Sequence, residues 1–513
     1  MTTTLTEALH QHARSHPKSV AFQVGEDVWT YQRLVHEVER LARGLVGHGL
    51  GNGSRVALHM ANVPELAVAF CACFEIGAIA APLNTRLKSA ELRPLLQRLG
   101  PALYIGQADL YRRVAATDAS IVPWNARFIA GGAADDPWTQ GLTRLLEDGA
   151  AGPAKAEPEA DAPALLLTTS GTTGQPKFVT HTQATLTAVI ESVRHLGLDG
   201  TQTAAIALPL THGFGLFLFL ACLRFGVPVV LLERFDPDAV LDAIERYRCT
   251  WLPGVPAMFG ALLERQQART RNVRSLKVCL SSGDICPLRL QEQFATVFGT
   301  RLRSFWGATE AAGCLTYGSE PGPVSCIVEG AEVRLIDDSG APVPRGEVGE
   351  LAVRGPNVTI GYWAGPGLIE DAPHDGWFRT GDLMRQDAND DLWFVSRKKD
   401  LIISGGLNIS PAEIERVLTA HPAVRDAAVV GVPDPALGQR VAGFVEMERG
   451  TRGIILKEIL AGVTVLLADY KVPERLEVVD AIPRNGLGKI DRKSLLAKIS
   501  ESKSSDAGWI ASI

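Results

Sequence analysis

The stretch from Thr168 to Lys177 combines the residue types that bind phosphate. Its sequence, TTSGTTGQPK, supplies two glycines, five hydroxyl side chains and one lysine after the apolar run 164–167. Glycines let backbone N–H groups approach an anion closely, and the lysine adds positive charge. The P-loop of ordinary NTPases requires glycine directly before its lysine and a hydroxyl residue after it. Pro176 and Phe178 occupy those places, so the stretch predicts another kind of phosphate loop, with a polar surface turn as the alternative.

A second group of chemically useful side chains lies at 305–310, with the sequence FWGATE. Its aromatic residues beside a glycine offer a stacking surface, and Thr309 offers a hydroxyl group. Glu310 supplies the hard carboxylate oxygen that Mg²⁺ prefers. A motif this short is more often an ordinary loop when it is considered alone.

Four further side chains have both a functional and a structural interpretation. Asp382 follows Gly381, where it is either an acceptor for a ribose diol or the acidic residue of a hairpin turn. Arg397 lies ahead of a glycine-glycine turn and either binds phosphate or is solvated. Lys489 is a single lysine on a glycine-rich turn, which is usually solvated, and His212 is consistent with a buried, hydrogen-bonded core histidine.

The segment Thr169 to Lys177 resembles the signature loop of the adenylate-forming enzymes. This group contains acyl-CoA and aryl-CoA ligases, firefly luciferase and the adenylation domains of peptide synthetases. The resemblance extends from about Leu5 to Leu496, with the motifs in the family order. It departs from the family at Thr168, where an aromatic residue is usual, and at Phe178, where glycine is usual.

The resemblance implies an ATP-dependent ligase that converts a carboxylic acid to acyl-AMP and then transfers the acyl group to a thiol. It is most similar to a carboxylate–CoA ligase, with ATP, Mg²⁺ and coenzyme A as cofactors. One alternative is a stand-alone adenylating enzyme that loads the phosphopantetheine of an acyl-carrier protein. The other is a non-catalytic nucleotide-binding relative, which the retention of Lys177, Glu310, Asp382, Arg397 and Lys489 together argues against.

The resemblance also assigns roles to individual residues. Lys489, Lys177 and His212 form the expected catalytic set, in which Lys489 stabilises negative charge on the α-phosphate and the carboxylate as they meet. Trp306 would pack against adenine, and Glu310 would hold the metal ion. The expected ATP contacts are Thr169, Ser170, Gly171, Thr172, Thr173, Gly174, Lys177, Ser282, Gly283, Asp284, Phe305, Trp306, Gly307, Thr309, Glu310, Asp382, Arg397 and Lys489.

The acid and CoA sites follow from the same resemblance. The acid pocket is expected at His212, Gly213, Phe214, Gly254, Ala312 and Gly313, and the CoA contacts at Arg86, Gly405, Gly406 and Lys471. Small residues leave room in this pocket, and it holds no Arg or Lys to pair with a second carboxylate. Because a buried unpaired charge is costly, we expect an apolar monocarboxylate, either an aryl acid or a medium-chain acyl acid.

Composition limits the class of protein. A chain of 513 residues is too long for one core, and 46% hydrophobic with 21% charged residues is typical of a soluble globular protein. A net charge of −6 without a long basic run makes nucleic acid a poor candidate partner. The eight cysteines are scattered through apolar sequence, which favours reduced thiols over disulfides or zinc. No secretory signal or membrane span is expected, so we predict a cytoplasmic protein.

Hydrophobic periodicity predicts the elements that position these residues. Strands and helices alternate over 55–105 and again over 204–298, and the period changes to two from Ala331. We predict an α/β fold with a large N-terminal region of two doubly wound αβ layers plus a small β-barrel, followed by a small mobile α+β C-terminal domain. The predicted domains are 1–398, with the barrel at about 325–396, and 399–513. Lys399 is the hinge by resemblance, and 133–164 is predicted to be a loop.

Overall fold

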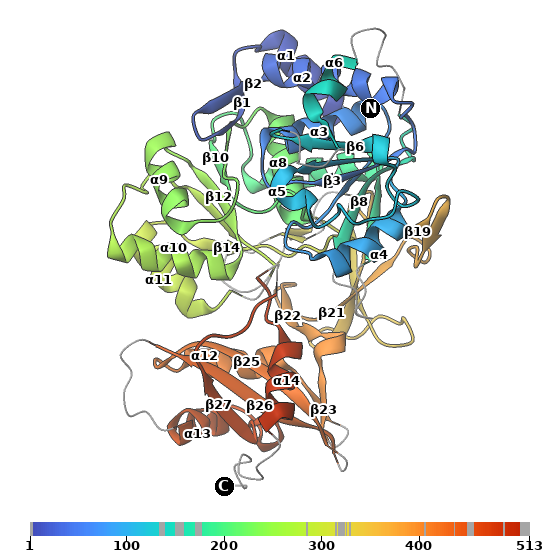
Figure 1. The fold of residues 1–513 in the computed structure, drawn as a ribbon. Coiled ribbons are helices and arrows are strands. Elements are labelled where there is room, and N and C mark those ends of the chain that lie inside the picture. Colours follow the sequence, from blue (N-terminus) through green and yellow to red (C-terminus); the bar gives the residue numbers. More distant parts are fainter. Residues whose placement is uncertain are drawn as a thin grey trace.

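The computed structural model shows a large N-terminal region joined to a smaller C-terminal domain (Figure 1). Two long sheets lie in the upper part of Figure 1, and the C-terminal domain lies below them. The structure describes residues 4–132, 139–148, 158–169, 177–283, 286–312, 315–316, 324, 326–327, 330–404, 407–434, 437–448, 456–485 and 488–502.

The first sheet has the strand order β20-β19-β9-β8-β4-β3-β5-β6-β7 among the described residues. Its strands are β3 (Arg55–His59), β4 (Ile79–Pro82), β5 (Leu103–Gln107), β6 (Arg127–Ala130), β7 (Gln140–Gly141), β8 (Pro163–Thr169), β9 (Lys177–Thr182), β19 (Gly361–Gly365) and β20 (Leu368–Glu370). The pairs from β8 through β4, β3, β5 and β6 to β7 are parallel, whereas β9 is antiparallel to both β8 and β19.

The second sheet has the order β14-β13-β12-β10-β11-β1-β2. Its strands are β1 (Val20–Val24), β2 (Asp27–Thr30), β10 (Ala204–Ile206), β11 (Val229–Leu231), β12 (Trp251–Gly254), β13 (Val278–Ser281) and β14 (Leu302–Ser304). Its pairs are parallel except for the β1–β2 hairpin. The two doubly wound layers predicted from the sequence are therefore confirmed.

Helices cover the two sheets and fill the space between them. They are α1 (Leu5–Ser15), α2 (Tyr31–Gly47), α3 (Pro64–Glu75), α4 (Ser89–Leu99), α5 (Ala108–Tyr111), α6 (Leu142–Asp148), α7 (Gln183–Ser192), α8 (Gly213–Phe225), α9 (Pro237–Tyr247), α10 (Pro256–Ala268) and α11 (Leu288–Phe298), with short 3₁₀ turns η1 (Trp124–Ala126) and η2 (Arg194–Leu196). Helices α3 and α8 are apolar on nearly every side because they lie inside the main core, which takes residues from both sheets.

The last part of the chain forms two smaller antiparallel units. The first is β17 (Glu332–Ile336), β18 (Val348–Arg354), β21 (Phe378–Gln386) and β22 (Leu392–Arg397), in that order, with the pair β15 (Leu315–Thr316) and β16 (Cys326–Ile327) before it. The turn η3 (Lys398–Asp400) follows β22. The C-terminal domain contains β23 (Ile402–Ser404), β24 (Leu407–Ile409), α12 (Pro411–Ala420), β25 (Val424–Asp434), β26 (Gly438–Met447), α13 (Leu456–Leu466), η4 (Asp469–Lys471), β27 (Arg475–Val479) and α14 (Arg492–Ser502). It packs its own apolar clusters.

Two details differ from the elements predicted from the sequence. Helix α6 and strand β7 lie within the stretch 133–164 that was predicted to be a loop. Within the range expected for the barrel, the described strands β17, β18, β21 and β22 form a four-stranded sheet in an open order, and β19 and β20 join the first sheet through β9. Of the helices that the structure describes, none is long and apolar enough to cross a membrane.

Candidate functional site

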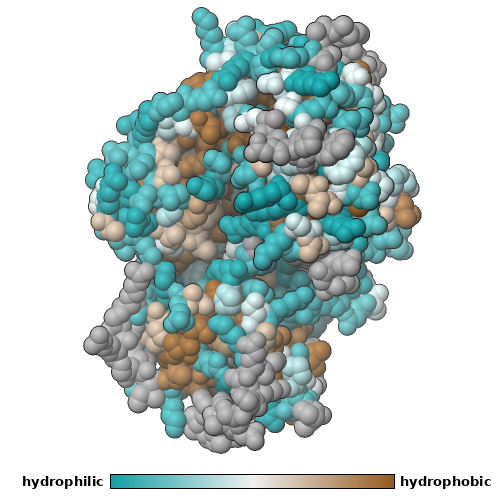
Figure 2. Space-filling model, in the orientation of Figure 1, coloured by the Kyte–Doolittle hydropathy of each residue, from teal (hydrophilic) through white to brown (hydrophobic). Residues whose placement is uncertain are grey.

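A cavity of about 1030 Å³ lies where the carboxyl ends of strands from both large sheets face the four-stranded sheet and the turn at Lys489. Its walls include Asn62 after β3, Leu208 after β10, Val255 after β12 and Ser282 after β13. Ligands of open α/β sheets bind outside the carboxyl ends of the strands. In the space-filling view, apolar side chains are visible in the recess between the parts of the N-terminal region that contain the first and the second sheet (Figure 2).

Most of the residues singled out in the sequence meet at this cavity. Those on its wall are Arg86, Thr169, Lys177, His212, Gly213, Phe214, Ser282, Gly283, Phe305, Gly307, Thr309, Glu310, Ala312, Asp382, Arg397, Lys399 and Lys489. Residues Trp306, Gly254 and Lys471 are described but do not line it. Predictions for Ser170, Gly171, Thr172, Thr173, Gly174, Asp284, Gly313, Gly405 and Gly406 lie outside the described residues.

Asp382 is held in place by two partners on either side of its carboxylate. The indole N–H of Trp306 donates to Oδ2 at 2.9 Å, and Nε of Arg397 lies 3.2 Å from Oδ1. Asp382 and Arg397 are opposite each other in the β21–β22 ladder. The Asp382 side chain is only 7% exposed, so these contacts fix a charged acceptor at the cavity wall.

The ring of Trp306 packs in the core of the four-stranded sheet, beside residues such as Leu351 and Met384. The resemblance places this ring against adenine, and that contact stays a prediction. What the structure shows is a second task for Trp306, which is to orient Asp382.

Tyr362, which the sequence analysis did not single out, connects Glu310 to Lys177. Its hydroxyl group donates to Oε1 of Glu310 at 2.9 Å, and Nζ of Lys177 lies 4.6 Å from the centre of its ring. Burial and the Glu310 charge raise the pKa of Tyr362, so its phenol remains a donor. Lys177 also pairs with Asp371, Nζ to Oδ2 at 2.7 Å.

His181 fixes the backbone beside Glu310. Its Nε2 lies 2.8 Å from the carbonyl oxygen of Thr309, which can only accept, so Nε2 carries the proton. Burial lowers the pKa of His181 to about 4, which keeps the ring neutral. The N–H of Thr359 donates to the carbonyl oxygen of Glu310 at 2.7 Å. A single histidine in a buried strand gives no sequence signal for such a contact.

His212 is the N-cap residue of α8 and lines the cavity together with Lys489. Burial, with a further contribution from the positive charge of Lys489, lowers the pKa of His212 to about 4. The turn before Lys489 is closed by Asn485, whose Oδ1 accepts the N–H of Lys489 at 3.2 Å. This turn therefore brings a cation from the C-terminal domain into a cavity built mainly by the N-terminal region.

The part of the wall near His212 is apolar. Phe214 and Phe305 stack with ring centres 6.2 Å apart, and Phe217, Leu218 and Met258 line the same cavity. Such a surface accommodates an apolar ligand and disfavours a second buried charge. No cluster of three or more His, Cys, Asp or Glu side chains suited to a resident metal occurs among the residues with a described placement.

Comparison with known proteins gives matches over nearly the whole chain. The family model described as AMP-binding enzyme matches residues 9–363, and the model of the AMP-binding enzyme C-terminal domain matches residues 413–489. The chain is 36% identical to a feruloyl-CoA synthase of Amycolatopsis over 94% of this chain and 96% of that protein. It is 33% identical to an indoleacetate–CoA ligase of Aromatoleum aromaticum over 96% and 98% of the two chains.

A solved structure shows the same fold. The o-succinylbenzoate CoA synthetase of Bacillus subtilis, in complex with its acyl-adenylate intermediate, aligns with a TM-score of 0.80 and 30% identity. The alignment covers 95% of this chain and 97% of that one.

Proposed function

Because this chain belongs to the AMP-binding enzyme family, we propose that it is an acid–CoA ligase that joins an apolar monocarboxylic acid to coenzyme A at the expense of ATP. The observation that carries this proposal is the convergence of Lys489, His212, Asp382, Arg397 and Glu310 on one cavity. These side chains come from both domains. Each would contact a different group of the two substrates, such as the ribose, the phosphates or the carboxylate of the acid.

In the first half-reaction, a carboxylate oxygen of the acid attacks the α-phosphorus of ATP. A new P–O bond forms, the bond to the bridging oxygen breaks, and pyrophosphate leaves with its electron pair. Negative charge increases where the two anions meet, and Lys489 is the cation positioned to offset it. Asp382 accepts hydrogen bonds from the ribose, while Trp306 and Arg397 hold it in place.

Glu310 suits a magnesium ion that is shared with the triphosphate. Mg²⁺ is usually bound by one or two carboxylates together with phosphate oxygens rather than by an all-protein cage. One carboxylate oriented by Tyr362 fits that pattern, and the bound ion would neutralise charge on the pyrophosphate. Lys177 would add its own positive charge on the same side of the cavity.

In the second half-reaction, the thiol of coenzyme A attacks the acyl carbonyl carbon of acyl-AMP. The C–S bond forms, the bond to the phosphate oxygen breaks, AMP leaves, and the thiol proton passes to solvent or a base. A single chain serves both reactions if the C-terminal domain turns about Lys399, which takes Lys489 out of the cavity. The predicted hinge residue lies in the η3 turn at 398–400.

The acid is proposed to be an aryl or medium-chain monocarboxylate. The wall formed by Phe214, Phe217, Leu218 and Met258 is apolar, and a second carboxylate would need a partner to offset its desolvation. Neutral His212 adds a polar group without adding a charge. The relatives named for feruloyl-CoA and indoleacetate–CoA support an aromatic acid.

The test is a pyrophosphate-release screen over many carboxylic acids, with ATP, Mg²⁺ and purified enzyme, with and without CoA. We expect release with an aryl or medium-chain acid and formation of the thioester only with CoA. If a dicarboxylate or an amino acid were the best substrate, the pocket assignment would be wrong. If acyl-AMP formed but only a carrier-protein phosphopantetheine accepted the acyl group, the acceptor would be the carrier rather than CoA.

A further inference from the structure

Val255 joins strand β12 to helix α10 and lies beside two glycine turns from distant parts of the chain. A Cβ atom built on Gly283 would be 3.4 Å from its Cγ1, and one built on Gly488 would be 3.5 Å from its Cγ2. Gly283 is one of the expected ATP contacts, and Gly488 directly precedes Lys489. One methyl group of Val255 therefore faces Gly283, and the other faces Gly488 in the turn that carries Lys489.

Both turns have backbone geometry that depends on glycine. The φ angle is +87° at Gly283 and +80° at Gly488, in the left-handed region that side chains other than glycine rarely adopt. Val255 is a β-branched residue with few accessible rotamers. Its methyl groups are consequently a stiff surface against which a close-fitting turn can rest.

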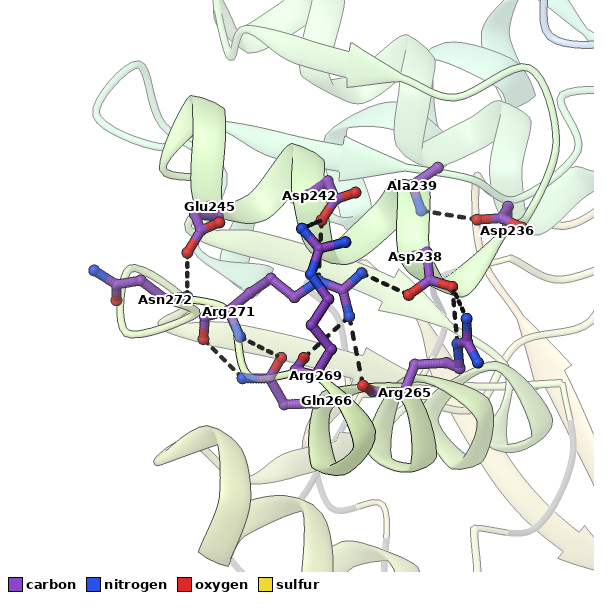
Figure 3. A network of polar contacts seen from close by, with 10 residues as sticks. All are labelled: Asp236, Asp238, Ala239, Asp242, Glu245, Arg265, Gln266, Arg269, Arg271 and Asn272. Carbon is purple, nitrogen blue, oxygen red and sulfur yellow. Dashed lines mark hydrogen bonds and ion pairs between the residues drawn. The ribbon is translucent and has the colours of Figure 1, made fainter.

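The backbone of Val255 is held firmly on the N-terminal region. Val255 is the residue before the first turn of α10, and its carbonyl oxygen accepts the N–H of Met258 at 2.9 Å. Figure 3 shows the polar network that ties α10 and the loop after it to α9. In this network, the buried Arg271 side chain contacts Asp242 at 2.9 Å and Asp238 at 2.5 Å.

The C-terminal domain is held against the same side of the N-terminal region by polar contacts. Arg289 on α11 donates to the carbonyl oxygen of Pro422 at 3.0 Å and lies 3.1 Å from Glu448. Arg425 forms an ion pair with Glu264 on α10. These contacts bring the domains together, but exposed ion pairs fix position weakly. Among the described residues, a methyl group of Val255 faces Gly488, directly before Lys489.

We propose that Val255 is a positioning residue for the first half-reaction, on which the Lys489 turn rests when Lys489 enters the cavity. This inference rests on the proposed function. Lys489 acts only where the carboxylate meets the α-phosphate, so the contact serves acyl-AMP formation. The attack of the thiol on acyl-AMP does not use it, because the C-terminal domain has then turned away.

The test compares Val255→Ala with Val63→Ala in both half-reactions. Val63 is a matched control because it also precedes a proline at the start of a helix, is also half-buried against the main core, and does not line the cavity. We expect Val255→Ala to slow acid-dependent pyrophosphate release about 10-fold, since small misplacements of a catalytic group are costly. Conversion of supplied acyl-AMP to the thioester should stay within about two-fold of the unchanged enzyme, as both reactions should in Val63→Ala.

A second comparison separates the lysine turn from the rest of the cavity wall. If Val255 acts through Lys489, then adding Val255→Ala to Lys489→Ala should change the residual pyrophosphate release by less than about two-fold. A further 10-fold loss in that background would show that Val255 contacts acid or nucleotide directly, which overturns the proposal. Equal losses in both half-reactions, or no loss in Val255→Ala, would overturn it too.

The melting temperatures of Val255→Ala and Val63→Ala distinguish a local effect from a loss of folding. We expect both to fall by similar amounts, because both remove two methyl groups from a half-buried site. The unchanged enzyme is the control for the proposed function: if it releases no pyrophosphate with any acid, the proposed function fails and not the contact at Val255.

Discussion

The indole N–H of Trp306 donates to Oδ2 of Asp382 at 2.9 Å, and the two residues come from segments far apart in the chain. Trp306 follows the last strand of the second sheet, whereas Asp382 lies in β21 of the four-stranded sheet. The bond therefore joins the segment that follows β14 to the predicted ribose acceptor in the four-stranded sheet. It remains buried, so removal of the donor leaves part of a charged acceptor unsatisfied.

Trp306→Phe should weaken ATP binding and stability together. Phenylalanine retains an aromatic ring in the core but has no N–H group for Asp382. Loss of a hydrogen bond to a charged group costs about 1.5–3 kcal/mol. We expect a higher KM for ATP with little change in the KM for the acid, and a lower melting temperature. An unchanged KM for ATP would show that Asp382 does not depend on this donor.

Tyr362→Phe and Tyr362→Leu should separate the two contacts of the tyrosine. Phenylalanine keeps the ring beside Lys177 and removes the hydroxyl group that orients Glu310. Removing a hydrogen bond behind a metal ligand typically weakens metal binding about 10–100-fold. We therefore expect Tyr362→Phe to raise the Mg²⁺ concentration needed for half-maximal ATP binding, measured by calorimetry. Tyr362→Leu should also raise the KM for ATP, and identical behaviour of the two variants would contradict a role for the ring.

Asp371→Asn should lower the KM for ATP. In the structure Asp371 forms an ion pair with Lys177. This ion pair must break before Lys177 can contact the triphosphate. The Asp371 side chain is 62% exposed, and exposed ion pairs contribute about 0–1 kcal/mol, which limits the gain to about five-fold. Asparagine tolerates the φ of +48° at this position.

Asp375→Asn is the matched control for Asp371→Asn. It removes the same charge at a neighbouring exposed position with a φ of +50°, and its carboxylate contacts His374 rather than Lys177. We expect its KM for ATP to be unchanged. Equal effects of the two substitutions would indicate a general change of surface charge rather than release of Lys177.

Stability should fall as the pH is lowered from about 6.5 to 4, in part through His59. Burial, with a contribution from Arg113, lowers the pKa of His59 to about 4, and its Nδ1 contacts the Tyr104 hydroxyl at 3.0 Å. In the unfolded chain His59 binds a proton near pH 6.5, whereas in the folded chain it does so only near pH 4. The contribution of His59 to the free energy of unfolding is therefore fully present above pH 6.5. It is lost as the pH falls toward 4, and the loss is on the order of 3 kcal/mol.

His59→Gln tests this pH dependence. The variant should be less stable than the unchanged protein at pH 7, because it alters a buried hydrogen bond. Its melting temperature should nevertheless fall less steeply between pH 6.5 and 5. A slope equal to that of the unchanged protein would show that His59 does not titrate in this range on unfolding.

The sequence predicted the parts of the site that follow strands. Thr169, Ser282 and Phe305 end or follow strands in both large sheets, and residues at the carboxyl ends of such strands meet in one region. Hydrophobic periodicity predicted the alternation of strands and helices over 204–298, where the apolar helix α8 lies. These features depend on local sequence or on a general rule of α/β folds.

Contacts that depend on long-range pairing could not be predicted in this way. Strand β19 pairs with β9 across a long sequence separation, Tyr362 opposite Val179, and this pairing is what brings Tyr362 to Glu310 and Lys177. Likewise, the short motif containing Trp306 does not show which way the indole points. Its direction is decided by the core of the four-stranded sheet and by Asp382.

Lys398 and Lys399, at the predicted domain boundary, differ in their contacts with the N-terminal region. Nζ of Lys398 lies 2.6 Å from Asp338 and 3.2 Å from Glu350, so Lys398 is held to the N-terminal region. Lys399 is exposed and follows it in the 3₁₀ turn. A rotation of the C-terminal domain would therefore be taken up by the backbone from Lys399 onward.

Lys399→Pro should affect the two half-reactions differently. Proline fixes φ near the value of a 3₁₀ turn, so the observed arrangement remains accessible while rotation is blocked. It also disfavours a helical conformation at Lys398, so we expect acyl-AMP formation to fall a few-fold. Thioester formation from supplied acyl-AMP should fall about 10-fold or more, because it depends on the rotated arrangement. Lys399→Ala keeps the backbone N–H and free rotation, so both rates should stay near normal. If proline left the overall rate unchanged at a normal melting temperature, Lys399 would not be the hinge.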